Sequence, residues 1–270
     1  MDFDQFRVAT PTSFELAKLP TDYDGGVKDD DLKELREELW LELAEWQERL
    51  YAENKQSLLV VFQAMDAAGK DSSIGKLTSA LSAHGCHVKS FKKPSTLEAG
   101  HDFLWRIHAA APKSGEMTMF NRSHYEDVLI VKVHQWADAE TIERRYDHIN
   151  NFERLLADRG TKVVKFMLNI SKDYQLERFQ RRLENPDKHW KFNPGDLDER
   201  AKWSDYMHAF ESAIGRCSSD EAPWYIVPAE NRKYRDVMIA SVLRDTLKAM
   251  DPQYPEPDFD PTVYTVDSIS

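Results

Sequence analysis

The sequence predicts a three-layer α/β/α domain built on a five-stranded parallel sheet, and two observations indicate it. Short, almost continuously apolar runs recur along the chain, as expected for strands that are buried on both faces of a sheet. Stretches with helical periodicity separate these runs. Strands that alternate with helices imply right-handed crossovers, and therefore parallel strands covered by helices on both faces.

The strands are expected at 57–63, 86–91, 117–120, 163–168 and 224–227. The helices around them are expected at 71–83, 96–110, 138–158, 172–184, 198–215 and 232–250. A further helix is predicted over 30–51, where Leu or Trp recurs at every third or fourth position, so that one face is apolar. This face packs either on its own domain or against a partner subunit, and the pattern leaves both open.

Three segments are predicted from these patterns. Residues 1–55 form an N-terminal arm and the amphipathic helix, with Pro11, Pro20, Gly25 and Gly26 interrupting regular structure in the arm. Residues 56–250 form the core. The acidic, proline-bearing segment 251–270 is expected to cross the surface as an irregular strap.

Composition favours a soluble protein of a reducing compartment. The 270 residues are 41% hydrophobic, which suffices for a core, and the longest apolar runs are too short to span a bilayer. Cys86 and Cys217 are far apart and form no metal-binding or redox pattern. The first residues lack the apolar segment of a secretory signal. We therefore expect a cytoplasmic protein without a membrane partner.

The strongest functional signal is the segment 63–71, QAMDAAGKD, between the first predicted strand and a helix. In this context a glycine-rich loop cradles phosphate with backbone N–H groups, and its lysine reaches the terminal phosphates. Ala64 and Asp71 depart from the usual G-x-x-x-x-G-K-[ST] pattern. An ordinary helix start is the alternative. The predicted phosphate-binding residues of the loop are Ala67, Ala68, Gly69, Lys70 and Asp71.

Asp66 argues against the ordinary helix start. A carboxylate inside a phosphate loop is destabilising unless a cation bridges it to the phosphates, so Asp66 implies bound Mg²⁺, with Mn²⁺ as a substitute. Lys70 and Asp66 are therefore predicted to be catalytic.

The stretch DAAGKD at 66–71 resembles the phosphate loop of the polyphosphate kinase 2 family. The similarity continues, in order and over roughly residues 30–250, through FKKPS at 91–95, HDFLWR at 101–106, FNRSHYED at 120–127, KHWKFNPGD at 188–196 and WYIVPAENR at 224–232. The resemblance implies a P-loop kinase-like fold with a helical lid near 172–202, Mg²⁺, and long-chain polyphosphate as a substrate. We expect the five strands, numbered along the chain, in the order 2-3-1-4-5.

The segment after the third predicted strand carries further candidates. Arg122 is expected to neutralise charge on the transferred phosphoryl group. Many family members have aspartate where this chain has Asn121, so Asp127 is predicted as the missing metal carboxylate; a surface residue is the alternative. The Tyr-Glu-Asp sequence at 125–127 resembles the class III branch of the family, which accepts both AMP and ADP. Glu126 is therefore predicted to contact the nucleotide. A solvated glutamate at a helix start is its alternative.

A polyanionic substrate requires local positive charge, because the net charge of the chain is −11. A basic cluster in the predicted lid meets this requirement, although a carboxylate-paired solvated face would explain it too. Lys92 and Lys93 are predicted to bind nucleotide together with Arg122 and Glu126. They could instead extend the track for the polyanion, or be plain surface lysines. The predicted cluster comprises Arg178, Arg181, Arg182, Lys188 and Lys191.

The predicted function is Mg²⁺-dependent phosphoryl transfer from polyphosphate to ADP and AMP, with ATP as product and the reaction reversible. The expected partners are these substrates and copies of the chain itself, without nucleic acid. An ATP-dependent nucleotide or nucleoside kinase of the same fold is one alternative. A P-loop binding module without turnover is another, although Lys70 and Asp66 are both retained.

Overall fold

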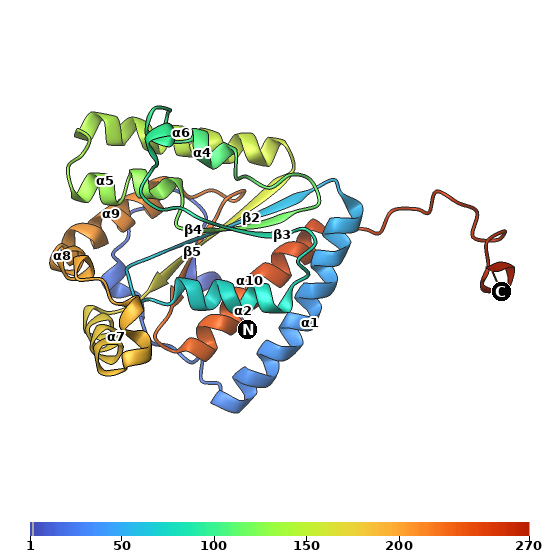
Figure 1. The fold of residues 1–270 in the computed structure, drawn as a ribbon, viewed down its shortest axis with the longest axis horizontal. Helices are drawn as coiled ribbons and strands as arrows, with labels where there is room; N and C mark the ends of the chain where they lie inside the picture. The colour runs from blue at the N-terminus through green and yellow to red at the C-terminus, as the bar shows by residue number, and fades with distance from the viewer. Residues whose placement is uncertain (2, 270) are drawn as a thin grey trace.

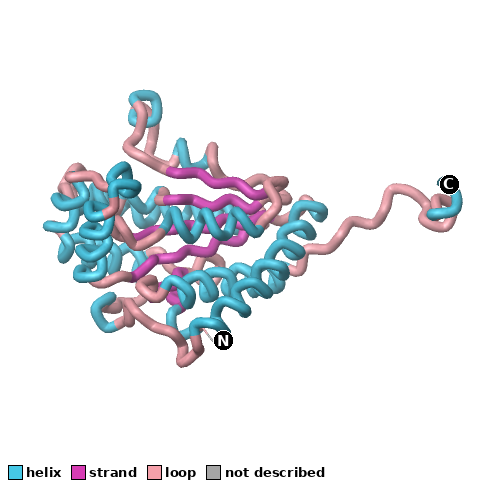
Figure 2. The backbone as a smooth tube through the Cα atoms, turned by 60° about the horizontal axis from the view of Figure 1, so that its bottom comes forward, coloured by secondary structure: helices cyan, strands magenta, loops and turns pink. Residues whose placement is uncertain are grey.

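The structure is a computed structural model that describes residue 1 and residues 3–269. Its centre is a six-stranded sheet in the order β1-β6-β5-β2-β4-β3, with helices on both faces (Figures 1 and 2). The strands are β1 (Arg7–Val8), β2 (Ser57–Ala64), β3 (Cys86–Ser90), β4 (Met117–Asn121), β5 (Thr161–Asn169) and β6 (Trp224–Pro228). The pairings among β2 to β6 are all parallel. The five predicted strands and their order are therefore confirmed.

The sixth strand was not predicted. β1 is only two residues long and pairs antiparallel with the edge strand β6, so the arm contributes a strand to the sheet. Two 3₁₀ turns in the arm, η1 (Asp4–Phe6) and η2 (Leu16–Lys18), bury Phe6 and Leu16.

Ten helices are described, and most match the prediction. They are α1 (Asp29–Glu53), α2 (Lys70–Ala80), α3 (Thr96–Ala99), α4 (Trp105–His108), α5 (Ile130–Val133), α6 (Ala139–Asp158), α7 (Lys172–Glu184), α8 (Gly195–Ala201), α9 (Trp203–Arg216) and α10 (Arg232–Met250). The prediction of one continuous helix over 96–110 is wrong: α3 ends at Ala99, with Gly100 as its C-cap, and the Asp102 carboxylate accepts from the Leu104 N–H to form a separate turn. A break at Lys202 likewise divides 198–215 into α8 and α9.

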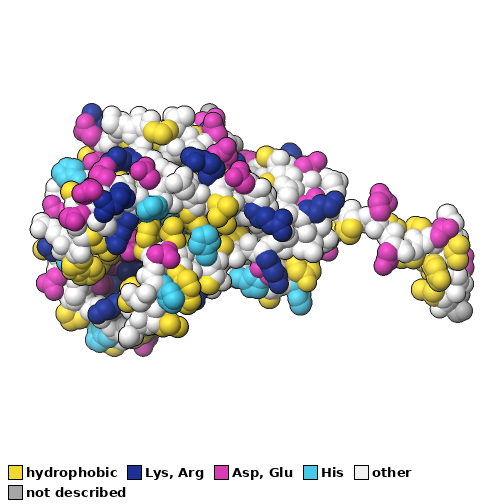
Figure 3. All heavy atoms as spheres, turned by 90° about the horizontal axis from the view of Figure 1, so that it is seen from above, with side chains coloured by type: hydrophobic (Ala, Val, Ile, Leu, Met, Phe, Trp, Pro, Cys, Tyr) yellow, Lys and Arg dark blue, Asp and Glu magenta, His cyan; other side chains and the backbone are white. Residues whose placement is uncertain are grey.

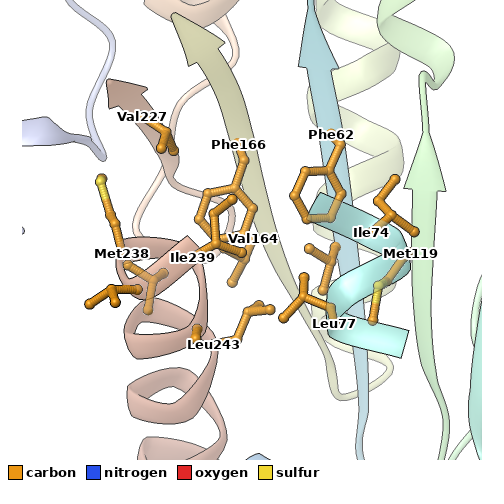
Figure 4. Packing of buried hydrophobic residues seen from close by; sticks show 14 of the residues in the cluster. Phe62, Ile74, Leu77, Met119, Val164, Phe166, Val227, Met238, Ile239 and Leu243 are labelled. Carbon is orange, nitrogen blue, oxygen red and sulfur yellow. The ribbon is translucent and has the colours of Figure 1, made fainter. Parts of the chain in front are cut away.

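The core lies in two layers, one on each side of the sheet. Alternate residues of β2 serve the two layers: Phe62 packs with α2 and α10, whereas Val61 packs with α6 and α9. Figure 4 shows Phe62 and Phe166 between the side chains of α2 and α10. The apolar face of α1 packs along α10, so of the two alternatives the chain's own domain is the observed one.

The C-terminal segment does not lie where the sequence predicted it. Residues 253–269 are exposed and run away from the body instead of crossing its surface as a strap (Figure 1). Apolar and acidic side chains alternate along this projection (Figure 3). Repeated prolines remove backbone donors that could pair with the body. In the described part of the chain, no helix has the length and apolar character needed to cross a membrane.

Candidate active site

The loop between β2 and α2 contains two residues in the left-handed region of backbone conformation, which favours glycine. Ala67 and Gly69 have left-handed φ angles of 68° and 105°. A Cβ atom at Gly69 would overlap the guanidinium of Arg235, which lies beneath the loop and donates to the Ala68 carbonyl at 3.5 Å. Position 69 therefore requires glycine for its conformation and for the close approach of Arg235.

Lys70, the first residue of α2, is fixed within the loop. Its ammonium donates to the Ala64 carbonyl at 2.8 Å and to the Met65 carbonyl at 3.4 Å, and only 8% of the residue is exposed. Burial lowers the pKa of Lys70, and the nearby Asp66 carboxylate opposes that shift. The ammonium is thus aimed back across the loop, at the place where a phosphate would lie.

Two contacts join the loop to the end of β4. The Arg122 guanidinium donates to the Asp66 carboxylate at 2.9 Å, and the Asn121 amide donates to Asp71 at 2.5 Å. From the opposite side, Gln175 of α7 donates to the Asp66 carbonyl at 2.9 Å. The structure therefore brings Asp66, Lys70 and Arg122 together at the carboxyl ends of the parallel strands, where ligands of open α/β sheets bind.

Above the loop lies a cleft of about 700 Å³. Nine of the side chains that line it are Lys or Arg, and three are Asp. The cleft thus concentrates positive charge in a chain whose net charge is −11. Its cationic residues are Lys70, Lys92, Lys93, Arg122, Arg178, Arg181, Arg182, Lys188 and Lys191.

The three arginines of α7 differ in their partners. Arg181 pairs with Glu177, one turn earlier on the exposed surface. Arg182 donates to the Lys191 carbonyl at 3.1 Å and lies 3.5 Å from the Asp196 carboxylate. Among the described residues, Arg178 has no carboxylate partner, and burial together with neighbouring guanidiniums lowers its pKa. A half-buried cation without a counterion, facing the cleft, is a site for an anionic ligand.

The lysines complete the two ends of the cleft. Lys92 and Lys93 follow β3, while Lys188 and Lys191 belong to η4 (Pro186–Lys191) of the lid. All four are exposed, and no ion pair to a carboxylate is found for any of them in the described chain. They extend the positive lining from the loop to the lid.

Glu126 lies in a second, smaller cavity of about 230 Å³ beside the cleft. The two cavities share Asp66, Arg122, Asn193 and Asp196. Burial raises the pKa of Glu126, although the positive charges of Arg122 and Lys70 oppose the shift. With its nitrogen facing Glu126, the Gln63 amide donates to this carboxylate at 2.9 Å. Glu126 therefore lines the smaller cavity, near Arg122 and Asp66 of the wall that both cavities share, and is not a solvated surface residue.

The structure does not bring Asp127 to the loop. Its carboxylate lies 3.5 Å from the Arg145 guanidinium, and it lines a different cavity together with Arg106 and Arg144. Burial raises the pKa of Asp127 to about 6. Its predicted role as a metal ligand beside Asp66 is therefore corrected. The physical reason is η3 (His124–Asp127): neighbouring residues of a 3₁₀ helix point about 120° apart, so Glu126 and Asp127 face different cavities.

Three residues of the site were not predicted. Asp196 faces the cleft near Arg182, Gln175 holds the loop, and Arg235 supports it from below. Asp196 lies inside the KHWKFNPGD segment, so the sequence carried a signal for it. Arg235 is only 1% exposed, and in the sequence it is one basic residue among several of α10.

No group of three or more His, Cys, Asp or Glu side chains that could hold a metal ion occurs among the described residues. The carboxylates that line the cleft are those of Asp66, Asp71 and Asp196. Mg²⁺ commonly uses one or two carboxylates and completes its shell with substrate phosphates and water. The donor set therefore fits an ion that binds together with a phosphate substrate.

Comparison with known proteins agrees with this geometry. An AMP/ADP-polyphosphate phosphotransferase of Meiothermus ruber is 44% identical, over 94% of this chain and 96% of that protein. An ADP-polyphosphate phosphotransferase of Rhodopseudomonas palustris is 40% identical, over 93% and 92% respectively. The crystal structure of polyphosphate kinase 2 from Arthrobacter aurescens superposes with a TM-score of 0.92 at 42% identity, covering 96% of this chain and 95% of that one. Residues 26–255 match the family described as Polyphosphate kinase 2 (PPK2), and the chain belongs to this family.

Proposed function

We propose that this enzyme transfers the terminal phosphoryl group of inorganic polyphosphate to ADP and to AMP, and that the reaction is reversible. The observation that carries the proposal is the cleft above the phosphate loop, which nine Lys and Arg side chains line. The names of the two relatives support the same substrates. Membership of the family makes the chain a phosphoryl-transferring enzyme, which removes the binding-module alternative.

The lining of the cleft favours polyphosphate over ATP as donor. A polyphosphate chain has no base, so it needs only a continuous row of cations. A donor ATP would also need a largely apolar pocket for its adenine. Among the residues that the structure describes, Phe91 is the one aromatic side chain in the lining of the cleft, and it is only 4% exposed. The rival ATP-dependent kinase is therefore less well supported by this site.

Each residue of the loop has a role in the proposed transfer. Lys70 and the loop N–H groups hold the phosphates on either side of the bond that breaks. Arg122 lies beside Asp66 and stabilises negative charge on the transferred group. An acceptor phosphate oxygen attacks in line, and the shortened polyphosphate leaves along the cleft. Arg178 and Arg182 bind the donor chain, while Lys92 and Lys93 bind either the donor or the nucleotide.

We further propose Asp66 as the protein ligand of a Mg²⁺ ion, for which Mn²⁺ can substitute. Asp66 would hold the ion, and a bound ion would supply positive charge that neutralises part of the phosphate charge. Asp66 reaches the shared wall of both cavities, where donor and acceptor phosphates would meet. Its present partner, Arg122, holds the carboxylate in that position.

One assay tests the proposal. Purified protein is mixed with Mg²⁺, long-chain polyphosphate and either ADP or AMP, and ATP is measured. We expect ATP from ADP and ATP with intermediate ADP from AMP, and no product after chelation with EDTA. Transfer from ATP to a nucleoside or nucleoside monophosphate, without any use of polyphosphate, would favour the rival kinase instead.

Self-assembly and cytoplasmic placement remain predictions. Light scattering of the protein as it elutes from a size-exclusion column would measure its mass. A mass above the 31.4 kDa of one chain would show self-assembly. Cell fractionation with an antibody would locate it. A filter-binding assay with DNA and RNA at physiological salt would test the expectation that nucleic acid is not a partner.

A further inference from the structure

A buried charge cluster lies directly beneath the segment that carries Arg122 and Glu126. At its centre is Lys165, in the middle of β5, which has no exposed surface. Its ammonium donates to the Glu153 carboxylate at 2.5 Å, to the Tyr125 hydroxyl at 3.0 Å and to the Cys217 carbonyl at 2.7 Å. All three of its N–H groups are therefore used.

The Glu153 carboxylate gathers the other members of the cluster. Besides the contact to Lys165, it accepts from the Tyr125 hydroxyl at 2.8 Å, and the His124 ring nitrogen Nε2 lies 3.3 Å away. Burial lowers the pKa of His124, although the hydrogen bond to Glu153 and its charge oppose the shift. We name Lys165, Glu153, Tyr125 and His124 the buried tetrad.

Stability alone gives no reason for charges at this place. A buried ion pair can often be replaced by apolar residues of similar volume without loss of stability, because the desolvation of two charges offsets their attraction. What such a pair does provide is a fixed arrangement of the groups that it contacts. In this protein the tetrad joins β5, α6 and η3, which are separate elements of the sheet, a covering helix and the active-site segment.

The active-site segment needs such fixing. Arg122 has a left-handed φ of 61°, a strained conformation for a residue other than glycine, which persists only where surrounding contacts enforce it. Ser123 then caps η3 by accepting from the Tyr125 N–H at 3.2 Å. His124 and Tyr125, the next two residues, both end on Glu153. Arg122 and Glu126 flank these two anchors.

We propose that Glu153 and Lys165 are positioning residues for the acceptor side of the active site: through Tyr125 and His124 they set the positions of Arg122 and Glu126. The inference rests on the proposed function, because that function assigns Arg122 to the transferred phosphate, and on the prediction that Glu126 contacts the nucleotide acceptor. Glu153 and Lys165 themselves touch neither cavity. Their removal should therefore affect the use of nucleotide more than the binding of polyphosphate.

The test separates positioning from stability with a neutral pair. The single variant Glu153→Gln leaves a buried ammonium without its anion and should lower the Tm strongly. The double variant Glu153→Gln with Lys165→Met removes both charges and should recover most of that Tm. Its kcat/KM for ADP should nevertheless stay about 10- to 100-fold below that of the wild type, as misplacement of reacting groups predicts. The KM for polyphosphate should change by less than about threefold.

A second variant covers the case in which the double variant does not fold. Tyr125→Phe keeps the ion pair and removes one hydroxyl, and it should lower kcat/KM for ADP by at least about fivefold with a small change in Tm. Tyr146→Phe is the matched control, since Tyr146 is also buried, at 1% exposure, and its hydroxyl contacts Lys132 of α5. The control should lose a similar amount of Tm and keep its activity.

Wild-type kcat/KM in the double variant, or equal effects of Tyr125→Phe and Tyr146→Phe, would overturn the inference. Every variant is compared with wild-type protein under the same assay. If the wild type used only ATP as donor, the proposed function would fail, whereas the ratio of variant to wild-type activity with that donor would still decide the role of the tetrad.

Discussion

The two sides of the cleft are built differently. On the loop side, Lys70 is buried, Gly69 lies against Arg235, and Asp66 is bound by Arg122. On the lid side, α7 buries only Gln175 and Phe179, and η4 and α8 have no buried residue. A segment with few buried contacts changes position at low cost in free energy, whereas one embedded in the core does not.

This difference matches the two tasks of the proposed reaction. The transferred phosphoryl group has one position, and groups held rigidly around it stabilise its charge best. A polyphosphate chain has many equivalent phosphates and must move along the cleft after each transfer. Exposed cations on a loosely held lid suit that movement, because none of them needs one exact partner.

The largest effect is expected on the loop side. Lys70→Ala should lower kcat by about 10²–10³-fold or more, because the loop loses a charge that is already in place for the phosphates. Asp66→Asn keeps the shape of the side chain and should lose a similar factor if Asp66 holds the metal. Steady-state rates measure both effects, and circular dichroism and Tm check the fold. Lys33→Ala, at an exposed position of α1, is the control and should behave as the wild type.

Substantial turnover of Asp66→Asn at saturating Mg²⁺ would contradict the metal assignment. Loss of activity in Lys70→Ala together with loss of the folded state would instead show that the lysine serves the loop and not the phosphates.

Substitution of one glycine on each side of the cleft, Gly69 and Gly195, tests how rigidly the backbone of each side is held. Gly69→Ala forces an alanine into a left-handed conformation and against Arg235, and should cost about 1–3 kcal/mol of stability. At Gly195 in the lid an added Cβ would meet only the Asn193 side chain, at 3.4 Å. Gly195→Ala should change the free energy of unfolding by less than about 0.5 kcal/mol. Chemical denaturation measures both, and equal losses would mean that the lid is as rigidly held as the loop.

The same contrast explains what could be predicted from the sequence. The strands and the strand–loop–helix arrangement of β2 and α2 were predicted correctly, because long buried runs and a short loop between a strand and a helix have a strong local pattern. β1 was missed, since two paired residues leave no periodicity, and Arg235 was missed, because a buried arginine does not differ from a surface one in sequence. The role of Asp127 was wrong because a single turn of η3 decides which cavity a side chain enters, and the sequence does not specify that turn.

On the lid side a moderate effect is expected. Arg178→Ala should raise the apparent KM for polyphosphate about tenfold, which corresponds to one charge-assisted contact, and should alter the KM for ADP much less. Arg154→Ala, at an exposed position of α6 outside the cleft, is the control. Added salt should also raise this KM, since exposed charges are screened over about 8–10 Å at ordinary ionic strength. A larger change in the KM for ADP than for polyphosphate would place Arg178 on the acceptor side.

The smallest effect is expected at Glu126, in the smaller cavity beside the cleft. Glu126→Ala should change the ratio of kcat/KM for AMP to that for ADP by a few-fold, about 1 kcal/mol or less, because the carboxylate lines the smaller cavity and not the cleft proposed for the donor. Since burial raises the pKa of Glu126, its carboxyl group takes up a proton at a higher pH than an exposed glutamate would. Lowering the pH should therefore move the wild-type ratio toward that of Glu126→Ala. Glu126→Ala also serves as the control, because the phosphates of AMP and ADP titrate in the same way in assays of the wild type and of this variant. A pH dependence that the variant lacks is therefore due to Glu126. Equal losses with AMP and ADP, or a wild-type ratio whose pH dependence matches that of the variant, would show that Glu126 supports the site without selecting the acceptor.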